Sequence, residues 1–269
     1  MKVDALLLLA VEASLVAGRA ILKIYSDGNT GVTWKSDQSP LTEADRLSDE
    51  LITSVLGPTG IPVLSEESAQ APYPTRKDWK RCWIVDPLDG TREFIGRNGD
   101  FTVNIALVEQ GKPIAGVVFA PVTGELYFGS AGSGSWKVLV QEPFTGNLPV
   151  EEIMQSAISL PVMKRSERPF TIVASRSHRN PETDDYIREL EKREGEVVVV
   201  SRGSSLKICL VAEGVADIYP RFGPTMEWDT AAGHAIAIFA GYRIFDVRKE
   251  EELSYNKENL LNPWFIVQK

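Results

Sequence analysis

The chain has 269 residues, 43% of them apolar and 25% charged, which is the composition of a globular protein and excludes disordered and fibrous classes. This length suffices for one large domain or two small ones with a well-buried core. Acidic residues outnumber basic ones by 37 to 29, a net charge of −8, and no basic stretch is present. Nucleic acid polymers are therefore not expected partners, and an anionic ligand would need another source of attraction, such as a bound divalent metal ion.

The two cysteines, Cys82 and Cys209, are far apart in sequence and form neither a disulfide framework nor a zinc motif, which favours a reducing, cytoplasmic location. Residues 3–17 are apolar but include Asp4 and Glu12 and lack a basic segment and a cleavage site, so we expect no signal peptide. We also expect no transmembrane segment, because no uncharged apolar run reaches about 18 residues.

The first part of the chain is predicted to combine helices with strands joined by hairpins. Apolar residues at helical spacing predict a helix over 3–26, and a second helix follows from about residue 39 to Gly57. A polar, proline-bearing segment at 68–80 is predicted to be a loop, and the glycine-rich segment 129–134 a turn. Buried strands are predicted at 61–65 and 82–85, and the stretch 101–139 is predicted to form strands joined by hairpin turns, at 101–108, 114–120 and 125–128.

The pattern changes after residue 168, where strands alternate with helices as in an α/β layer. The strands are predicted at 170–174, 197–201, 217–219 and 242–245, and the helices at 181–193, 204–213 and 229–240. Between the two patterns, residues 141–168 are rich in proline and poor in periodicity. We therefore predict two domains: an α+β domain over 1–165 and an α/β domain over 166–269.

Acidic residues follow the predicted strands, where ligand sites form in α/β sheets. Glu66 and Glu67 end one strand, and Asp86-Pro87-Leu88-Asp89-Gly90-Thr91 follows another. The proline and glycine permit a tight turn that aims both carboxylates and the Leu88 carbonyl at one point, a set of oxygens suited to Mg²⁺. The alternative is a plain strand end followed by an Asp-Gly turn.

Two further acidic residues, Asp45 and Asp229, could have a structural role at a helix start instead of a role in a site. Asp229 precedes a helix of small residues and could serve as its N-cap. Asp45 lies three residues after Thr42 and could complete a capping box. Glu227 is interpreted as a helix-flanking residue, and His234, among Ala and Ile, as a packed core histidine rather than a ligand.

Three motifs resemble those of the inositol monophosphatase family of lithium-sensitive, metal-dependent phosphatases: Leu64–Ser68, Trp83–Thr91 and Trp228–Ile236. Within that family, residues 91–107 and 203–214 are similar to the 3′(2′),5′-bisphosphate nucleotidases. The chain departs from the pattern at Glu227, where a less acidic residue is expected, and over 141–168.

The resemblance implies a layered αβαβα sandwich and a set of site residues. Mg²⁺ would be bound by Glu66, Asp86 and the Leu88 carbonyl, and a second ion by Asp86, Asp89 and Asp229; a third ion near Glu66 is left open. Asp45, Thr91 and Glu66 would be catalytic, with Asp45 hydrogen-bonded to Thr91, which helps to orient a water molecule. Substrate-binding residues would be Glu66, Leu88, Asp89, Gly90, Thr91, His178, Ser204, Lys207, Arg221 and Asp229.

The function that the resemblance implies is Mg²⁺-dependent hydrolysis of the 3′-phosphate of adenosine 3′,5′-bisphosphate to AMP and phosphate, with a role in sulfur metabolism. The alternatives are inositol monophosphatase or fructose-1,6-bisphosphatase activity on the same scaffold, and a non-catalytic regulator. The regulator is disfavoured because every carboxylate that the chemistry needs is present. A homodimer and peripheral attachment at the inner membrane face are left open.

Overall fold

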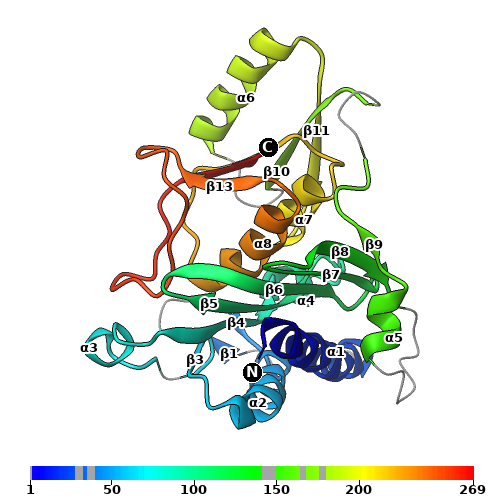
Figure 1. Ribbon diagram of the computed structural model, residues 1–269. Coiled ribbons are helices and arrows are strands. Elements are labelled where there is room, and N and C mark those ends of the chain that lie inside the picture. Colours follow the sequence, from blue (N-terminus) through cyan, green and yellow to red (C-terminus); the bar gives the residue numbers. More distant parts are fainter. Residues whose placement is uncertain are drawn as a thin grey trace.

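The computed structural model describes residues 2–27, 33–34, 40–68, 70–140, 150–163, 168–175 and 180–269. Within them, helices and two sheets stack in five layers in the order α, β, α, β, α (Figure 1). The layered α/β sandwich that the family resemblance implies is therefore confirmed.

The first helical layer consists of α1 (Val3–Asp27) and α2 (Glu43–Leu56), which pack against each other and against one face of the larger sheet. By length and composition alone, α1 could cross a membrane, which the sequence argument does not anticipate. However, 56% of its most apolar window is buried inside the fold. Leu6, Val11 and Ile21 are among the residues of α1 that pack with Phe119 of the sheet, as in the core helix of a globular protein.

The larger sheet has seven strands in the order β3-β4-β5-β6-β7-β8-β9, of which only β3 and β4 are parallel. Their bounds are Val63–Ser65, Arg81–Asp89, Thr102–Glu109, Lys112–Ala120, Glu125–Ser130, Gly134–Leu139 and Ile158–Ser159. The hairpins expected over 101–139 are confirmed. Strand β4 does not end at Val85 as predicted; it continues to Asp89 through an irregularity between Asp86 and Asp89.

Several short elements complete this part of the molecule. The helix α3 (Tyr73–Arg76) lies in the segment predicted to be a loop, because Pro72 and Pro74 suit the start of a helix. The remaining short elements are β1 (Thr33–Trp34), β2 (Pro40–Leu41), the 3₁₀ turn Gly57–Thr59, α4 (Thr91–Ile95) and α5 (Val150–Gln155).

The middle helical layer, α7 (Leu206–Ala212) and α8 (Glu227–Phe239), lies between the two sheets. Helix α8 crosses strands β4 to β8, and all but a few of its side chains are buried. The close approach requires Gly116 on β6, because a Cβ there would collide with the Ala232 carbonyl and lie 2.8 Å from the Ala235 Cβ.

The smaller sheet has the strand order β11-β10-β12-β14-β13, and α6 (Pro181–Glu194) covers its outer face (Figure 1). Its strands are β10 (Phe170–Ser175), β11 (Val197–Arg202), β12 (Ile218–Arg221), β13 (Arg243–Asp246) and β14 (Phe265–Gln268). The strand β14, which the sequence analysis does not predict, lies antiparallel between β12 and β13. The change of sheet falls between Ser159 and Phe170, and the domain boundary at 165/166 stays a prediction.

Candidate active site

Carboxylates from three distant segments meet where β3, β4 and α8 come together. Oxygens of Glu66, Asp86 and Asp229 all lie within 4.8 Å of one another. Glu66 follows β3 directly, and its backbone N–H donates to the Val85 carbonyl of β4 at 3.2 Å. This cluster fits a divalent cation, because hard carboxylate oxygens at such spacing are ligands that Mg²⁺ prefers.

The irregular end of β4 supplies the rest of the predicted metal-binding motif. The Leu88 backbone N–H donates to Asp86 Oδ1 at 3.1 Å, and this hydrogen bond fixes the orientation of the Asp86 carboxylate. Gly90 follows at φ +95°, a left-handed conformation that an L side chain rarely adopts, and α4 begins at the next residue. Asp89 and Thr91 thereby reach the same pocket.

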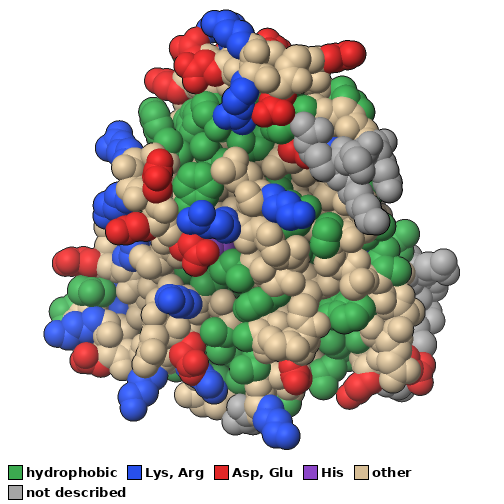
Figure 2. Space-filling view, turned by 45° about the horizontal axis from the view of Figure 1, so that its top comes forward, with side chains coloured by type: hydrophobic (Ala, Val, Ile, Leu, Met, Phe, Trp, Pro, Cys, Tyr) green, Lys and Arg blue, Asp and Glu red, His purple; other side chains and the backbone are tan. Residues whose placement is uncertain are grey.

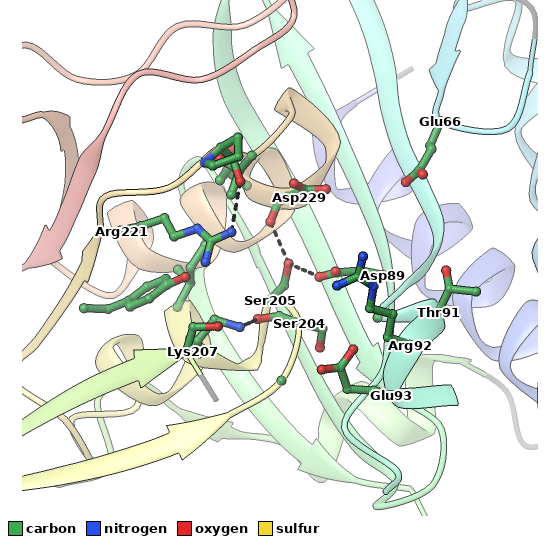
Figure 3. A pocket seen from close by; sticks show the side chains of 18 of the residues that line it. Glu66, Asp89, Thr91, Arg92, Glu93, Ser204, Ser205, Lys207, Arg221 and Asp229 are labelled. Atoms are coloured by element: carbon green, nitrogen blue, oxygen red, sulfur yellow. Dashed lines mark hydrogen bonds between the residues drawn. The ribbon is translucent and has the colours of Figure 1, made fainter. Parts of the chain in front are cut away.

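Asp89 lies beside the cluster and is held by two polar side chains. Its Oδ2 accepts from Asn104 Nδ2 at 3.2 Å and lies 3.0 Å from Ser205 Oγ. The same Ser205 hydroxyl lies 2.7 Å from the Asp229 carbonyl oxygen, so it bridges the β4 and α8 segments (Figure 3). Sequence reasoning missed both Asn104 and Ser205, because an Asn in a strand and a second Ser before a helix carry no signal on their own.

Asp45 contacts both the helix start and the pocket. Its Oδ2 accepts from Thr42 N at 2.7 Å and Thr42 Oγ1 at 2.5 Å, which completes the capping box of α2. Its Oδ1 accepts from Thr91 Oγ1 at 3.2 Å. One side chain therefore makes both the capping contact and the predicted contact with Thr91, and the catalytic role of Asp45 stays a prediction.

Burial, together with repulsion between neighbouring carboxylates, raises the pKa of three carboxyl groups here: Asp86, Asp89 and Asp229. Burial, followed by the negative charge of Glu66, Asp89 and Asp229, holds the pKa of Asp86 well above its usual range. The same two causes, burial and then the Asp89 charge, raise the pKa of Asp229 to about 8. Such a cluster is stabilised by a bound divalent cation, which fits the residues present.

The opposite wall of the pocket is cationic and polar, and Figure 3 shows it facing the carboxylates. Burial lowers the pKa of Lys207 to about 8, and its Nζ donates to the Ser204 carbonyl at 2.6 Å. Arg221, the last residue of β12, donates through Nη2 to the Pro224 carbonyl at 2.9 Å. Among the described residues, Ser204 Oγ and Arg221 Nε are buried without a hydrogen-bond partner, so this wall has donors to spare for a ligand.

Details of this wall differ from the expectations. Ser204 does not begin the helix: it has φ +44°, and Ser205 is the residue that flanks α7. Arg92, Glu93 and Tyr219 also line the pocket, whose volume is about 270 Å³. His178 lies outside the described residues, so its place in the site stays a prediction.

The residues of the α8 motif occupy three different environments. Asp229 is not an N-cap but the third residue of the helix, and its Oδ2 accepts from Met226 N at 2.8 Å. His234 is buried with its Nδ1 2.9 Å from the Tyr255 hydroxyl, and burial lowers its pKa to about 3. The interpretation of His234 as a neutral core residue is confirmed. Glu227, predicted to flank the helix, is its first residue and is completely buried.

Comparisons with known proteins agree with this geometry. A family model described as the inositol monophosphatase family matches residues 2–265. The 3′(2′),5′-bisphosphate nucleotidase CysQ of Salmonella typhimurium is 46% identical over 256 residues, which cover 93% of this chain and 94% of that protein. The protein of the same name from Escherichia coli is 44% identical with the same coverage.

A solved structure extends the likeness to three dimensions. The crystal structure of CysQ from Bacteroides thetaiotaomicron has a TM-score of 0.89 and 50% sequence identity to this chain. The alignment covers 98% of this chain and 97% of the other.

Proposed function

Because the chain belongs to the inositol monophosphatase family, we propose that it is a Mg²⁺-dependent phosphatase that hydrolyses the 3′-phosphate of adenosine 3′,5′-bisphosphate, leaving AMP and phosphate. The observation that carries the proposal is the pairing of a carboxylate cluster with a cationic wall across one pocket. The identity to nucleotidases over nearly the whole chain supports the substrate class.

The carboxylates are assigned to two metal ions. Glu66, Asp86 and the Leu88 carbonyl would hold one Mg²⁺, and Asp86, Asp89 and Asp229 a second; a third ion near Glu66 stays open. Bound Mg²⁺ neutralises phosphate charge and makes a water molecule more acidic.

The protein's own groups orient the reactants. Thr91 donates its hydroxyl hydrogen to Asp45 Oδ1, so the Thr91 oxygen keeps its lone pairs for a hydrogen bond from the attacking water. Asp45 is the positioning partner of this pair, because its other oxygen is anchored at Thr42. The backbone N–H groups of Gly90 and Thr91 are proposed to bind phosphate oxygens.

The cationic wall is assigned to the part of the substrate that a simple sugar phosphate lacks. Lys207 and Arg221 carry positive charge on the side of the pocket opposite Glu66, and Ser204 offers an unpartnered hydroxyl. These groups, together with His178 as predicted, are proposed to bind the 5′-phosphate and the nucleoside. Inositol phosphate has no second phosphate to use them.

The wider expectations are consistent with a small-molecule enzyme. On the face shown in Figure 2, Lys and Arg side chains are interspersed with Asp and Glu, which is unlike a nucleic-acid-binding surface. Cys82 and Cys209 are both buried and unpaired, so a reducing cytoplasm is part of the proposal. Nothing in the described ranges supports a homodimer or attachment to the inner membrane face, and the proposal includes neither.

Phosphate release tests the proposal directly. The purified protein is assayed with Mg²⁺ and, in turn, adenosine 3′,5′-bisphosphate, inositol 1-phosphate and fructose 1,6-bisphosphate. We expect the bisphosphonucleoside to have the highest kcat/KM, EDTA to abolish activity, and Asp89→Asn to reduce the rate about 10³-fold. Activity in EDTA would contradict the metal-dependent proposal, equal efficiency on inositol 1-phosphate would contradict the substrate, and no release from any substrate would favour a regulator.

A further inference from the structure

Glu227 is a buried carboxylate that does not line the pocket. Its side chain has no exposed surface, although it lies only two residues before Asp229. Its oxygens accept hydrogen bonds from Asn256 N at 2.5 Å, Lys257 N at 3.0 Å and Lys257 Nζ at 2.6 Å. A buried carboxylate needs such partners, so Glu227 and the turn Asn256–Glu258 hold each other in place.

Arg76 of α3 also binds the turn Asn256–Glu258 through hydrogen bonds. It is 3% exposed, and it donates to Asn256 Oδ1 at 3.0 Å, to the Glu258 carbonyl at 2.8 Å and to the Lys257 carbonyl. Asn256 returns a hydrogen bond to the Arg76 carbonyl at 2.7 Å. The turn is therefore bound by charged groups of two different segments, and Asn256 can adopt the left-handed φ of +59° that this requires.

The two segments joined by this turn both carry proposed metal ligands. Arg76 belongs to the connection between β3 and β4, which begins at Glu66, and Glu227 opens the helix that carries Asp229. The helix that Glu227 opens also packs against β4, the strand of Asp86.

The first turn of α8 receives further support from the same part of the chain. Asn262 donates through Nδ2 to the Met226 carbonyl at 2.7 Å and to Thr230 Oγ1 at 3.0 Å. Glu227 N donates to the Leu260 carbonyl at 3.0 Å. Residues 254–262 thus support the first turn of the helix that carries Asp229.

We propose that Glu227 is a positioning residue: by anchoring the turn Asn256–Glu258, it sets the spacing of Asp229 from Glu66 and Asp86. This inference rests on the proposed metal-binding function. To bind a cation the three groups must ionise, and carboxylates within 4.8 Å then repel each other, so a rigid support is needed to keep them at that spacing. The departure of Glu227 from the family pattern then concerns metal affinity rather than substrate preference.

The test is Mg²⁺ binding by the Glu227→Gln variant. Gln preserves the volume but faces an N–H donor with its own NH₂ group, so one side of the anchor is lost. Isothermal titration should show Mg²⁺ binding weakened about tenfold, as for other residues that orient metal ligands, and kcat should fall while KM for the substrate stays within about twofold.

Asp217→Asn is the matched control. It breaks the Arg168–Asp217 pair, whose side chains are each 10% exposed and whose residues lie just before strands β10 and β12 of the smaller sheet. This variant should lower the melting temperature and leave Mg²⁺ affinity unchanged, which separates positioning from a general loss of stability.

A second variant keeps the inference testable if Glu227→Gln does not fold. Glu227→Gln combined with Lys257→Met removes both charges of the Glu227–Lys257 ion pair, so it should fold and still bind Mg²⁺ about tenfold more weakly. Wild-type Mg²⁺ affinity in both variants would overturn the inference. Failure of the wild-type protein to bind Mg²⁺ or to release phosphate would instead overturn the proposed function.

Discussion

At the scale of single residues, Asp45 shows how one carboxylate serves two purposes. One oxygen stabilises the start of α2 through Thr42, and the other accepts the Thr91 hydroxyl in the pocket. The side chain has no exposed surface, so its orientation is determined by both partners at once. The helix cap therefore doubles as the support for the residue proposed to orient water.

We expect Asp45→Asn to reduce kcat by 10²- to 10⁴-fold, the usual range for a lost acid–base contribution, and stability by about 1 kcal/mol. Thr42→Ala is the matched control, because it removes half of the cap and leaves the Asp45–Thr91 contact. It should cost about 1 kcal/mol as well, with kcat nearly unchanged. Steady-state kinetics measures the change in kcat, and chemical denaturation measures the change in stability. Normal turnover in Asp45→Asn would show that Asp45 only caps the helix.

The raised pKa values of the carboxylates predict how metal-free protein responds to pH. Asp229 has a pKa of about 8 in the folded protein against an ordinary value of 3.8, so the folded state holds a proton that the unfolded state releases. Stability from this group is present at low pH and is lost as pH rises toward 8. Asp86 and Asp89 are shifted in the same direction.

In EDTA, the melting temperature should therefore fall between about pH 5 and pH 8, and the increase produced by Mg²⁺ should grow over the same range. Differential scanning calorimetry at several pH values measures both. The Asp229→Asn variant should show a weaker dependence, because one shifted group is gone. A melting temperature of metal-free protein that rises with pH over this window would contradict the prediction.

At the scale of elements, the contact between α8 and β6 holds the helix that carries Asp229 against the larger sheet. Gly116 leaves no room for a side chain beneath Ala232 and Ala235. Gly233, on the helix itself, faces Ile208 of α7, whose Cδ1 would lie 2.9 Å from an added Cβ. The shortest contact at Gly116 is with a backbone oxygen of the helix, whereas the shortest contact at Gly233 is with the end of a side chain, which can rotate.

We expect Gly116→Ala to destabilise the protein by about 1–3 kcal/mol, since either the strand or the helix must shift. Gly233→Ala should stay within about 1 kcal/mol of wild type, because the strain is offset by the better helix propensity of Ala. Urea denaturation compares the two variants. An equal loss of unfolding free energy in both variants would contradict the prediction that the backbone contact at Gly116 tolerates a side chain less well than the side-chain contact at Gly233.

At the scale of the whole molecule, the pocket exists only because two sheets and two helices meet. Its carboxylates come mainly from β3, β4 and α8, whereas Lys207 and Arg221 come from α7 and the smaller sheet. The two walls have opposite charge, which suits a substrate that is both a phosphate ester and a nucleotide.

Lys207→Ala or Arg221→Ala should therefore raise KM for adenosine 3′,5′-bisphosphate about tenfold, near 1.4 kcal/mol for one charge-assisted contact. The same variants should hardly change kinetics with a small monophosphate, which serves as the control substrate. An equal increase for both substrates would place these side chains in general support of the pocket rather than in nucleotide recognition.

Much of the fold follows from local sequence signals. The helical spacing that predicts α1 and the alternating strands around Pro121-Val-Thr-Gly124 are formed as expected, because helix periodicity and turn chemistry act over a few residues. The acidic strand ends and the family motifs identify the candidate ligands for the same reason. Two predictions are wrong: residues 68–80 are not all loop, because α3 forms there, and β4 does not end at Val85 but continues to Asp89. Prolines and a strand irregularity give ambiguous local signals at these places.

Other features are decided by tertiary structure alone. The insertion of β14 between β12 and β13, the contacts of Asn104 and Ser205 with Asp89, and the anchoring of Glu227 by Asn256 and Lys257 join residues far apart in the chain. No local pattern encodes them, because strand order and the burial of a charge depend on which distant partners satisfy it. Sequence patterns therefore identified the candidate metal ligands, whereas packing of the two sheets around α8 determined the distances between them and the direction of their pKa shifts.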